Sequence, residues 1–213
     1  MNKSISLIPY LILFTLLGCT SEIINMDTAR EQVGNYYESG TYTKEVEQII
    51  NETLNELSNK ILSENSTVVF DVDDTALSSY EYTSSIGFGF NNQTWKQWML
   101  DEKLTAILQV KKLYDWLIAK NVHVIFLTGR RSDECDATYN NLIKEGYTTF
   151  DTLICRPNLQ SKTDAADYKP TQRKALTEKG FDIIACIGDQ WSDMEGEYTG
   201  MKVKLPNYLY LID

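Results

Sequence analysis

The stretch Val68-Val69-Phe70-Asp71-Val72-Asp73-Asp74-Thr75 runs from apolar residues into three carboxylates. Its first half, rich in β-branched side chains, is typical of a strand that is buried on both faces. Open α/β folds bind ligands at the carboxyl ends of such strands, so the acids stand where a ligand site is expected. Carboxylates this close raise one another's pKa unless a cation neutralises them, and Mg²⁺ is a hard cation that one or two carboxylates can hold. An acidic turn after a strand is the alternative, because Asp is common in turns.

Two later apolar runs also end in polar residues. The run over 122–127 stops at Thr128-Gly129, where a hydroxyl and a backbone turn can donate hydrogen bonds to a phosphate oxygen. The run over 182–187 stops at Gly188-Asp189-Gln190-Trp191-Ser192-Asp193, which is a second acidic cluster.

Lys169 supplies a cation between these runs, directly before Pro170. The residue before a proline is disfavoured in helical geometry, and proline suits the first helical position. We therefore expect Lys169 at the mouth of a helix over 170–179. A helix N-terminus and an ammonium group together favour an anion, whereas the alternative is a solvated lysine on a loop.

Helical and strand patterns alternate along the chain. Helices are expected over 43–63, 105–120, 132–145 and 170–179, and strands from 67, over 122–127, 152–155 and 182–187, and in the closing segment 203–212. Such alternation predicts an α/β fold, a Rossmann-like parallel sheet with helices on both faces. The acids, Thr128 and Lys169 should then gather along one edge of that sheet.

The segment 76–104 interrupts this alternation and is rich in aromatic residues. Because it directly follows the first acidic strand, we expect a small helical cap over the site. Trp95 and Trp98 are expected to pack the cap onto the domain. Tyr80, Tyr82 and Phe88 are candidates for contact with an aromatic group of the substrate, with core packing as the alternative.

The N-terminus is expected to be a targeting segment. Lys3 precedes an apolar run of 13 residues over 5–17, which is too short to cross a bilayer but has the length of a signal-peptide core. The run ends in Leu16-Leu17-Gly18-Cys19, which resembles the lipobox of bacterial lipoproteins. That resemblance implies removal of residues 1–18 and a lipid on Cys19, with residues 19–42 as a tether and first helical piece. An ordinary signal peptide cut nearby and an uncleaved anchor are the alternatives.

The amino-acid composition limits which partners, metal sites and catalytic groups are expected. The formal charge of −10 argues against nucleic acid as a partner. The single histidine, His123, is interpreted as a strand residue, which excludes His-rich metal sites and chemistry that needs a second catalytic histidine. Beyond Cys19 the chain has Cys135, Cys155 and Cys186; one disulfide can form, but the spacing does not assign it.

The ordered motifs Asp71-x-Asp73-x-Thr75, Thr128-Gly129-Arg130, Lys169 and Gly188-Asp189-Gln190-x-x-Asp193 resemble those of the haloacid dehalogenase (HAD) superfamily. The residues in and around these motifs are most similar to the acid phosphatase branch of that superfamily, the class B and class C enzymes. This branch includes plant vegetative storage proteins and bacterial outer-membrane acid phosphatase lipoproteins. The resemblance covers about residues 45–212. It implies a HAD-like phosphatase domain over 43–213, with the cap insertion at about 76–104.

The resemblance also implies a phosphomonoesterase mechanism. Asp71 would be the nucleophile that forms an aspartyl-phosphate, and Asp73 the general acid and base. Thr128, Gly129 and Lys169 would hold the phosphate. Arg173 would assist or lie on the helix surface. Mg²⁺ would be held by Asp71, Asp73 (through its backbone carbonyl), Asp189 and Asp193.

Three functions follow from these observations. The first is a Mg²⁺-dependent acid phosphatase acting on small phosphomonoesters, with nucleoside monophosphates as one candidate, exported and anchored to a membrane through Cys19. The second is a storage or ligand-binding lipoprotein on the same fold with weak catalysis. The presence of all four motifs argues against this second function. The third is a surface lipoprotein for adhesion or for uptake of a ligand such as haem, for which the sequence shows no obvious haem ligand. The sequence does not define the oligomeric state.

Overall fold

A parallel five-stranded sheet, in the order β5-β4-β1-β6-β7, forms the centre of the molecule in a computed structural model that describes residues 23–158 and 165–212. Its strands are β1 (Ser66–Phe70), β4 (His123–Arg131), β5 (Thr152–Arg156), β6 (Asp182–Gly188) and β7 (Met201–Lys204). The α/β class and the parallel sheet predicted from the sequence are confirmed. The predicted signal segment and Cys19 lie outside the described residues.

Strand β1 is central and buried along its whole length. Successive side chains of a strand point to opposite faces, so the alternate residues of β1 enter two different cores. Val68 and Phe70 join the larger core, whereas Val69 joins the smaller one. The apolar run that opened the sequence analysis is therefore buried on both faces, as predicted.

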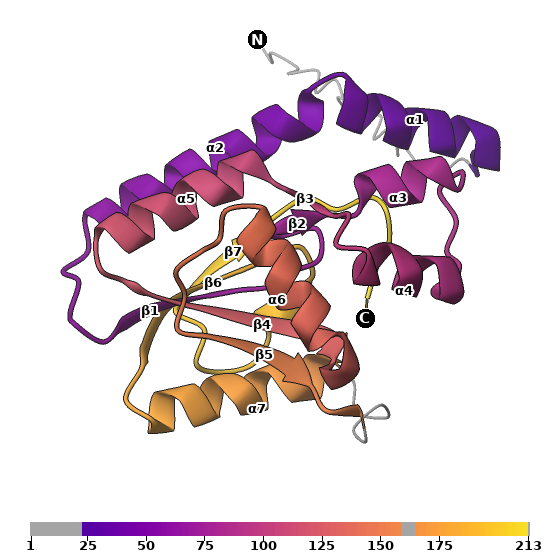
Figure 1. Ribbon diagram of the computed structural model, residues 1–213. Helices are drawn as coiled ribbons and strands as arrows, with labels where there is room; N and C mark the ends of the chain where they lie inside the picture. The colour runs from indigo at the N-terminus through magenta and orange to yellow at the C-terminus, as the bar shows by residue number, and fades with distance from the viewer. Residues whose placement is uncertain (1–22, 159–164, 213) are drawn as a thin grey trace, which may run out of the picture.

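Helices cover both faces of the sheet (Figure 1). The larger core takes buried residues from α2 (Thr41–Ser58), α5 (Leu108–Ala119) and α6 (Cys135–Lys144). The smaller core takes Tyr168 and Leu176 from α7 (Ala165–Glu178). Helices on both faces confirm the predicted architecture.

The boundaries of α2 and α5 differ from the predicted ones. Helix α2 ends at Ser58 rather than at residue 63, and Ile61, which the periodicity placed on its apolar stripe, is fully exposed. Helix α5 begins at Leu108 because Thr105–Ala106 forms the short strand β3, which pairs antiparallel with β2 (Leu77–Ser78). Pairing with a distant strand thus overrides the local helical pattern at that end.

The segment between β1 and α5 holds α3 (Tyr80–Ser85) and α4 (Asn92–Leu100), closed at its base by the β2–β3 pair (Figure 1). Tyr82 is buried, packs against Trp95 and Trp98, and donates from its hydroxyl to the carbonyl of Asn91 at 2.9 Å. The two tryptophans also pack against the larger core, which confirms the packing role predicted for them.

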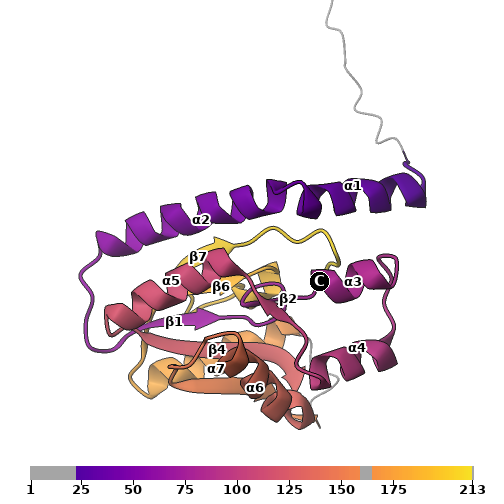
Figure 2. The same ribbon diagram turned by 45° about the horizontal axis from the view of Figure 1, so that its top comes forward.

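Helix α1 (Met26–Glu38) precedes α2 and lies nearly end to end with it along one side of the molecule (Figure 2). Gly40 joins the two helices at φ 83°, a left-handed conformation that suits glycine. At the other end of the chain, strand β7 covers Met201–Lys204, so it begins before the predicted closing segment 203–212 and shares only the first two residues of that segment, and the tail beyond it runs toward α3. Among the described residues, none of the helices has the length and apolar character needed to cross a bilayer.

A disulfide joins Cys135, the first residue of α6, to Cys155 in β5, and Cys186 is a buried free thiol. The structure thereby assigns the pairing that the spacing left open. Helix α6 begins just after the 3₁₀ turn η1 (Ser132–Glu134), which follows β4. The bond therefore ties the turn after β4 to the neighbouring strand.

Candidate active site

The carboxyl ends of β1, β4 and β6 bring the predicted site residues to one edge of the sheet. Asp71 directly follows β1, and its backbone N–H donates to the carbonyl of Ile187 in β6 at 2.9 Å. Asp189 directly follows β6, while Thr128 lies in the last part of β4. Because these strands pair in parallel, side chains that are far apart in sequence lie beside one another at this edge.

Lys169 links two of the acids across this edge. Its Nζ lies 2.6 Å from Oδ1 of Asp71 and 2.5 Å from Oδ1 of Asp193, and all three side chains are almost fully buried. Burial alone lowers the pKa of Lys169, but the charges of Asp71 and Asp193 more than offset this and raise it above its ordinary value. The ammonium group therefore remains charged.

The predicted helix mouth at Lys169 is wrong. Helix α7 begins at Ala165, so Lys169 and Pro170 both lie inside it. Proline has no N–H to donate within a helix, and the residue before it only tends to leave helical geometry. The two ion pairs of Lys169 hold it in the helix, so no helix N-terminus is added to its charge.

Asp189 is held by three donors. Its Oδ1 accepts from the hydroxyl of Thr75 at 3.2 Å, and its Oδ2 accepts from Nε2 of Gln190 at 2.6 Å and from Nδ2 of Asn207 at 2.7 Å. Asn207 belongs to the C-terminal tail, and nothing in the local sequence pattern marked it as a site residue. The tail therefore contributes to the arrangement of this edge.

Oxygen atoms of Asp71, Asp189 and Asp193 all lie within 4.8 Å of one another. Burial raises the pKa of Asp71 well above its ordinary value, against the opposing charge of Lys169. Burial and the charge of Asp193 raise the pKa of Asp189 to about 6. Lys169 alone cannot balance three buried carboxylates, so this cluster favours an added cation.

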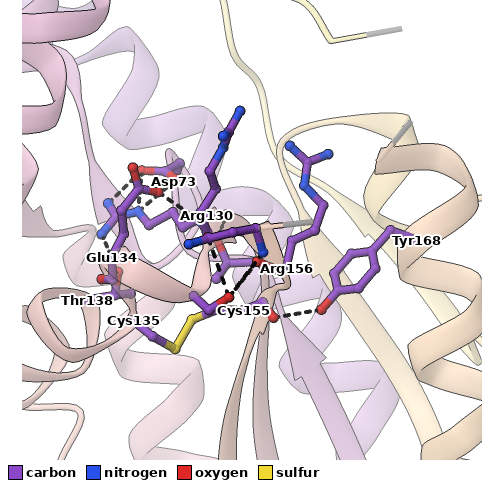
Figure 3. Close-up of a disulfide and its surroundings, with 12 residues drawn as sticks. Asp73, Arg130, Glu134, Cys135, Thr138, Cys155, Arg156 and Tyr168 are labelled. Atoms are coloured by element: carbon purple, nitrogen blue, oxygen red, sulfur yellow. Dashed lines mark hydrogen bonds and ion pairs between the residues drawn. A yellow bond between two sulfur atoms is a disulfide. The ribbon is translucent and has the colours of Figure 1, made fainter. Parts of the chain in front are cut away.

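The carboxylate of Asp73 pairs with a residue outside this cluster of acids. It forms an ion pair with Arg130, with Nη2 at 2.7 Å from Oδ1 and Nε at 3.0 Å from Oδ2 (Figure 3). The side chain of Asp73 is 24% exposed and that of Arg130 is 3% exposed. The carboxylate of Asp73 thus stays outside the cluster of Asp71, Asp189 and Asp193.

Thr128 is fully buried, and its Oγ1 accepts from the backbone N–H of Arg130 at 3.1 Å. At Gly129 a Cβ atom would meet nothing within 4 Å, so space is open there. Both residues lie beside the acids at the end of β4, where the sequence predicted a phosphate site.

Arg173 stabilises the acidic loop that follows β6, a role that the sequence analysis did not predict. Its guanidinium is fully buried and donates to the carbonyls of Asp193 (2.7 Å), Glu195 and Glu197. It therefore neither lies on the helix surface nor joins the acids directly. Its spacing of four residues from Lys169 was the available signal, because residues four apart share a helix face.

Asp74 closes the turn that leads from β1 to β2. It adopts φ 51°, and its carboxylate accepts from the backbone N–H of Ser79 at 2.8 Å and from the Ser79 hydroxyl at 2.5 Å. Burial raises the pKa of Asp74 to about 7, with the charge of Asp189 adding to the effect.

The aromatic residues proposed for substrate contact are largely used in packing. Tyr80 stacks on Tyr37 of α1 with ring centroids 4.7 Å apart, and its hydroxyl donates to Glu38 at 2.7 Å. Phe88 lies against Gly34 of the same helix. The segment between β1 and α5 therefore packs against α1, and substrate contact by Tyr80 or Phe88 stays a proposal.

Comparison with known proteins agrees with this arrangement. The family model of the HAD superfamily, subfamily IIIB (acid phosphatase), matches residues 14–213. The chain belongs to this family. Membership accounts for the sheet, the four motifs and their meeting at one edge.

Plant proteins are among the relatives. The chain is 38% identical to the stem 28 kDa glycoprotein of Glycine max over 152 residues, which are 68% of this chain and 60% of that protein. It is 32% identical to vegetative storage protein 1 of Arabidopsis thaliana over 204 residues, which are 91% of this chain and 75% of that protein. It is 34% identical to acid phosphatase 1 of Solanum lycopersicum over 148 residues, which are 68% of this chain and 58% of that protein. The chain thus spans only about three fifths of two of these relatives.

A solved structure shares the fold. The class C acid phosphatase of Bacillus anthracis superposes with a TM-score of 0.72 at 18% identity, covering 87% of this chain and 86% of the other. The tungstate-bound structure of the class C acid phosphatase of Bacillus anthracis gives a TM-score of 0.68 at 19% identity and covers 86% of each chain. This similarity confirms the HAD-like acid phosphatase fold.

Proposed function

We propose that this protein is a Mg²⁺-dependent acid phosphatase that hydrolyses small phosphomonoesters through an aspartyl-phosphate. One observation carries the proposal: Lys169 lies between Asp71 and Asp193, at 2.6 and 2.5 Å, with Asp189 in the same buried cluster. This arrangement supports the roles of a carboxylate nucleophile, a cation for the phosphate and carboxylate ligands for a metal at one edge of the sheet.

The chemistry proceeds in two steps. An Oδ atom of Asp71 attacks phosphorus, the bond to the leaving oxygen breaks, and Asp73 gives that oxygen a proton. A water molecule then attacks the phosphorus of the aspartyl-phosphate while Asp73 takes its proton. The bond to Asp71 breaks, which releases inorganic phosphate and restores the Asp71 carboxylate and the protonated Asp73 carboxyl group. Lys169 and the turn at Thr128-Gly129 would hold the phosphate oxygens during both steps.

The residues of the cluster fit Mg²⁺. The donor set is all oxygen, which this hard cation prefers, and the cluster has more negative charge than Lys169 balances. The side chains of Asp71, Asp189 and Asp193 and the backbone carbonyl of Asp73 would hold the ion. When bound, Mg²⁺ offsets the repulsion between the anionic nucleophile and the anionic ester.

The substrate class is proposed from the surroundings of the site. Aromatic residues of the cap and of α1, including Tyr37, Tyr80 and Phe88, lie near one another. Such surfaces suit an aryl or nucleoside leaving group, so nucleoside monophosphates are proposed as substrates. No nucleic-acid partner is proposed, given the formal charge of −10.

Replacing the nucleophile tests the mechanism. We expect Asp71→Asn to abolish phosphate release from an aryl phosphate and from nucleoside monophosphates, because an amide cannot form the aspartyl-phosphate. A chelator should abolish phosphate release by the wild-type protein, and added Mg²⁺ should restore that release. Asp182→Asn, at an exposed aspartate where β6 begins, is the matched control and should retain turnover. A folded wild-type protein that releases no phosphate from any ester would refute the proposal.

A second candidate is a storage or ligand-binding protein on the same fold. Its support is the similarity to vegetative storage protein 1, which aligns over 91% of this chain. The two candidates differ in turnover: under this one, the wild-type protein would bind Mg²⁺ and phosphate without releasing phosphate from esters.

Export and lipidation are also proposed. The apolar run over 5–17 followed by Gly18-Cys19 supports a lipoprotein signal and a membrane anchor on Cys19. In a bacterial host we expect the full chain in the membrane fraction and Cys19→Ser outside it, with Cys186→Ser, at a buried thiol, retaining the wild-type distribution. Equal partitioning of the wild-type and Cys19→Ser proteins would exclude the lipid on Cys19.

A further inference from the structure

Arg130 is buried beside the proposed general acid, and its guanidinium donates hydrogen bonds to Asp73 and to helix α6. Two of its nitrogen atoms, Nε and Nη2, face Asp73 at 3.0 and 2.7 Å. Its third nitrogen, Nη1, donates to the hydroxyl of Thr138 in α6 at 3.0 Å. An arginine fork that faces a carboxylate in this way restricts both the position and the rotation of that carboxylate.

Thr138 is itself fixed. It is fully buried in α6, and its hydroxyl donates to the carbonyl of Glu134 at 2.8 Å while it accepts from Arg130. Glu134 in turn accepts from the backbone N–H of Arg131 at 2.8 Å. The turn after β4 and the first turn of α6 therefore form one hydrogen-bonded unit behind the guanidinium.

The disulfide anchors this unit to the sheet. Cys135 begins α6 and is bonded to Cys155 of β5, which pairs with β4 at Thr128 (Figure 3). A continuous set of contacts thus runs from Cys155 through α6 to Thr138, Arg130 and finally Asp73. Asp73, by contrast, lies in the turn segment after β1, outside the five-stranded sheet, where its backbone makes an isolated bridge with Leu77.

We propose that Arg130 is the positioning residue of the proposed reaction: it holds the Asp73 carboxyl where it must give a proton to the leaving oxygen as the P–O bond breaks. This inference rests on the proposed function. Arg130 acts through Asp73 and does not bind the phosphate. Its removal should therefore matter most when the leaving oxygen needs a proton.

Leaving-group dependence tests this directly. We expect Arg130→Met to lower kcat/KM for an alkyl phosphate on the order of 10²-fold, because general acid catalysis contributes about that much or more. The loss for para-nitrophenyl phosphate, whose leaving oxygen is stable without a proton, should be at least about tenfold smaller on the same basis. Arg130→Lys should cause an intermediate loss of kcat/KM, since an ammonium group keeps the positive charge but lacks the forked pair of nitrogen donors. Arg131→Met, at the exposed next residue of β4, is the matched control.

Two further measurements separate positioning from phosphate binding. Competitive inhibition by inorganic phosphate should be unchanged in Arg130→Met, and in an Asp73→Asn background the same change should cost no further activity. Thr138→Val, which removes the hydroxyl that accepts from Nη1 and donates to the carbonyl of Glu134, gives the same test if Arg130→Met does not fold, with a smaller loss in the same leaving-group order. Equal losses for all esters together with weaker phosphate inhibition would make Arg130 a phosphate ligand and overturn the inference. If the wild-type protein itself has no turnover, the proposed function fails first and the inference fails with it.

Discussion

At the scale of single residues, Gly188 shows how the site depends on a position without a side chain. A Cβ atom at Gly188 would overlap the carboxylate and Cβ of Asp193, far inside van der Waals contact. Asp193 also accepts from the backbone N–H of Gln190 at 2.9 Å, which folds the loop back over the strand end. The glycine is therefore required by this close approach.

Gly188→Ala should strongly reduce turnover and Mg²⁺ affinity, because the methyl group displaces Asp193 and so disturbs its ion pair with Lys169. Steady-state kinetics and a Mg²⁺ titration measure the effect. The control is Gly34→Ala in α1, where a Cβ would make ordinary contact with Phe88 at 3.6 Å. It should be neutral or stabilise by about 0.5–1 kcal/mol, as expected for alanine over glycine in a helix. Wild-type kinetics in Gly188→Ala would contradict this account.

At the scale of elements, the turn after β4 and helix α6 depend on one covalent link. The Cys135–Cys155 bond closes a loop between residues 20 apart in sequence. In the chain-entropy model such a link stabilises the folded state by restricting the unfolded chain.

The double variant Cys135→Ser with Cys155→Ser should lose about 3 kcal/mol of unfolding free energy, the value expected for a loop of this size. Denaturant unfolding of the wild type and the variant measures the difference. Reductant should lower the stability of the wild-type protein and leave that of the double variant unchanged. Equal sensitivity of both proteins to reductant would show that the bond does not stabilise the fold.

At the scale of the whole molecule, buried acids link stability to pH. Burial raises the pKa of Asp74 to about 7 and that of Asp189 to about 6, whereas an aspartate of the unfolded chain titrates near pH ~4. Between these pH values the folded state retains protons that the unfolded chain has released. The stability of the metal-free protein should thus be greatest near pH 4 and should fall as pH rises to about 7.

Thermal unfolding in the presence of chelator, followed from pH 4 to 7.5, measures this dependence. Asp74→Asn should reduce the fall in stability without removing it, because the amide does not titrate, still accepts from the backbone N–H of Ser79, and leaves Asp189 to titrate. The exposed Asp182→Asn should keep the wild-type slope. Mg²⁺ should oppose the loss at higher pH by stabilising the ionised cluster. A metal-free protein that becomes more stable from pH 4 to 7 would contradict the pKa directions.

The local pattern of the chain was enough to predict the α/β class, the buried central strand and the acids at its end. The physical reason is that burial on two faces demands an uninterrupted apolar run, and parallel strands present their ends at one edge. The family motifs added the proposed roles of Asp71, Asp73, Lys169 and Asp189.

The contacts that hold these groups in place depend on the folded arrangement of the chain. Lys169 lies within a helix that was predicted to begin at Pro170, because two buried carboxylates bind it there. Arg130, Arg173 and Asn207 act across contacts that join residues 57, 20 and 18 positions apart. No local periodicity encodes such contacts. They arise when the sheet brings distant segments together and each buried polar group must find a partner.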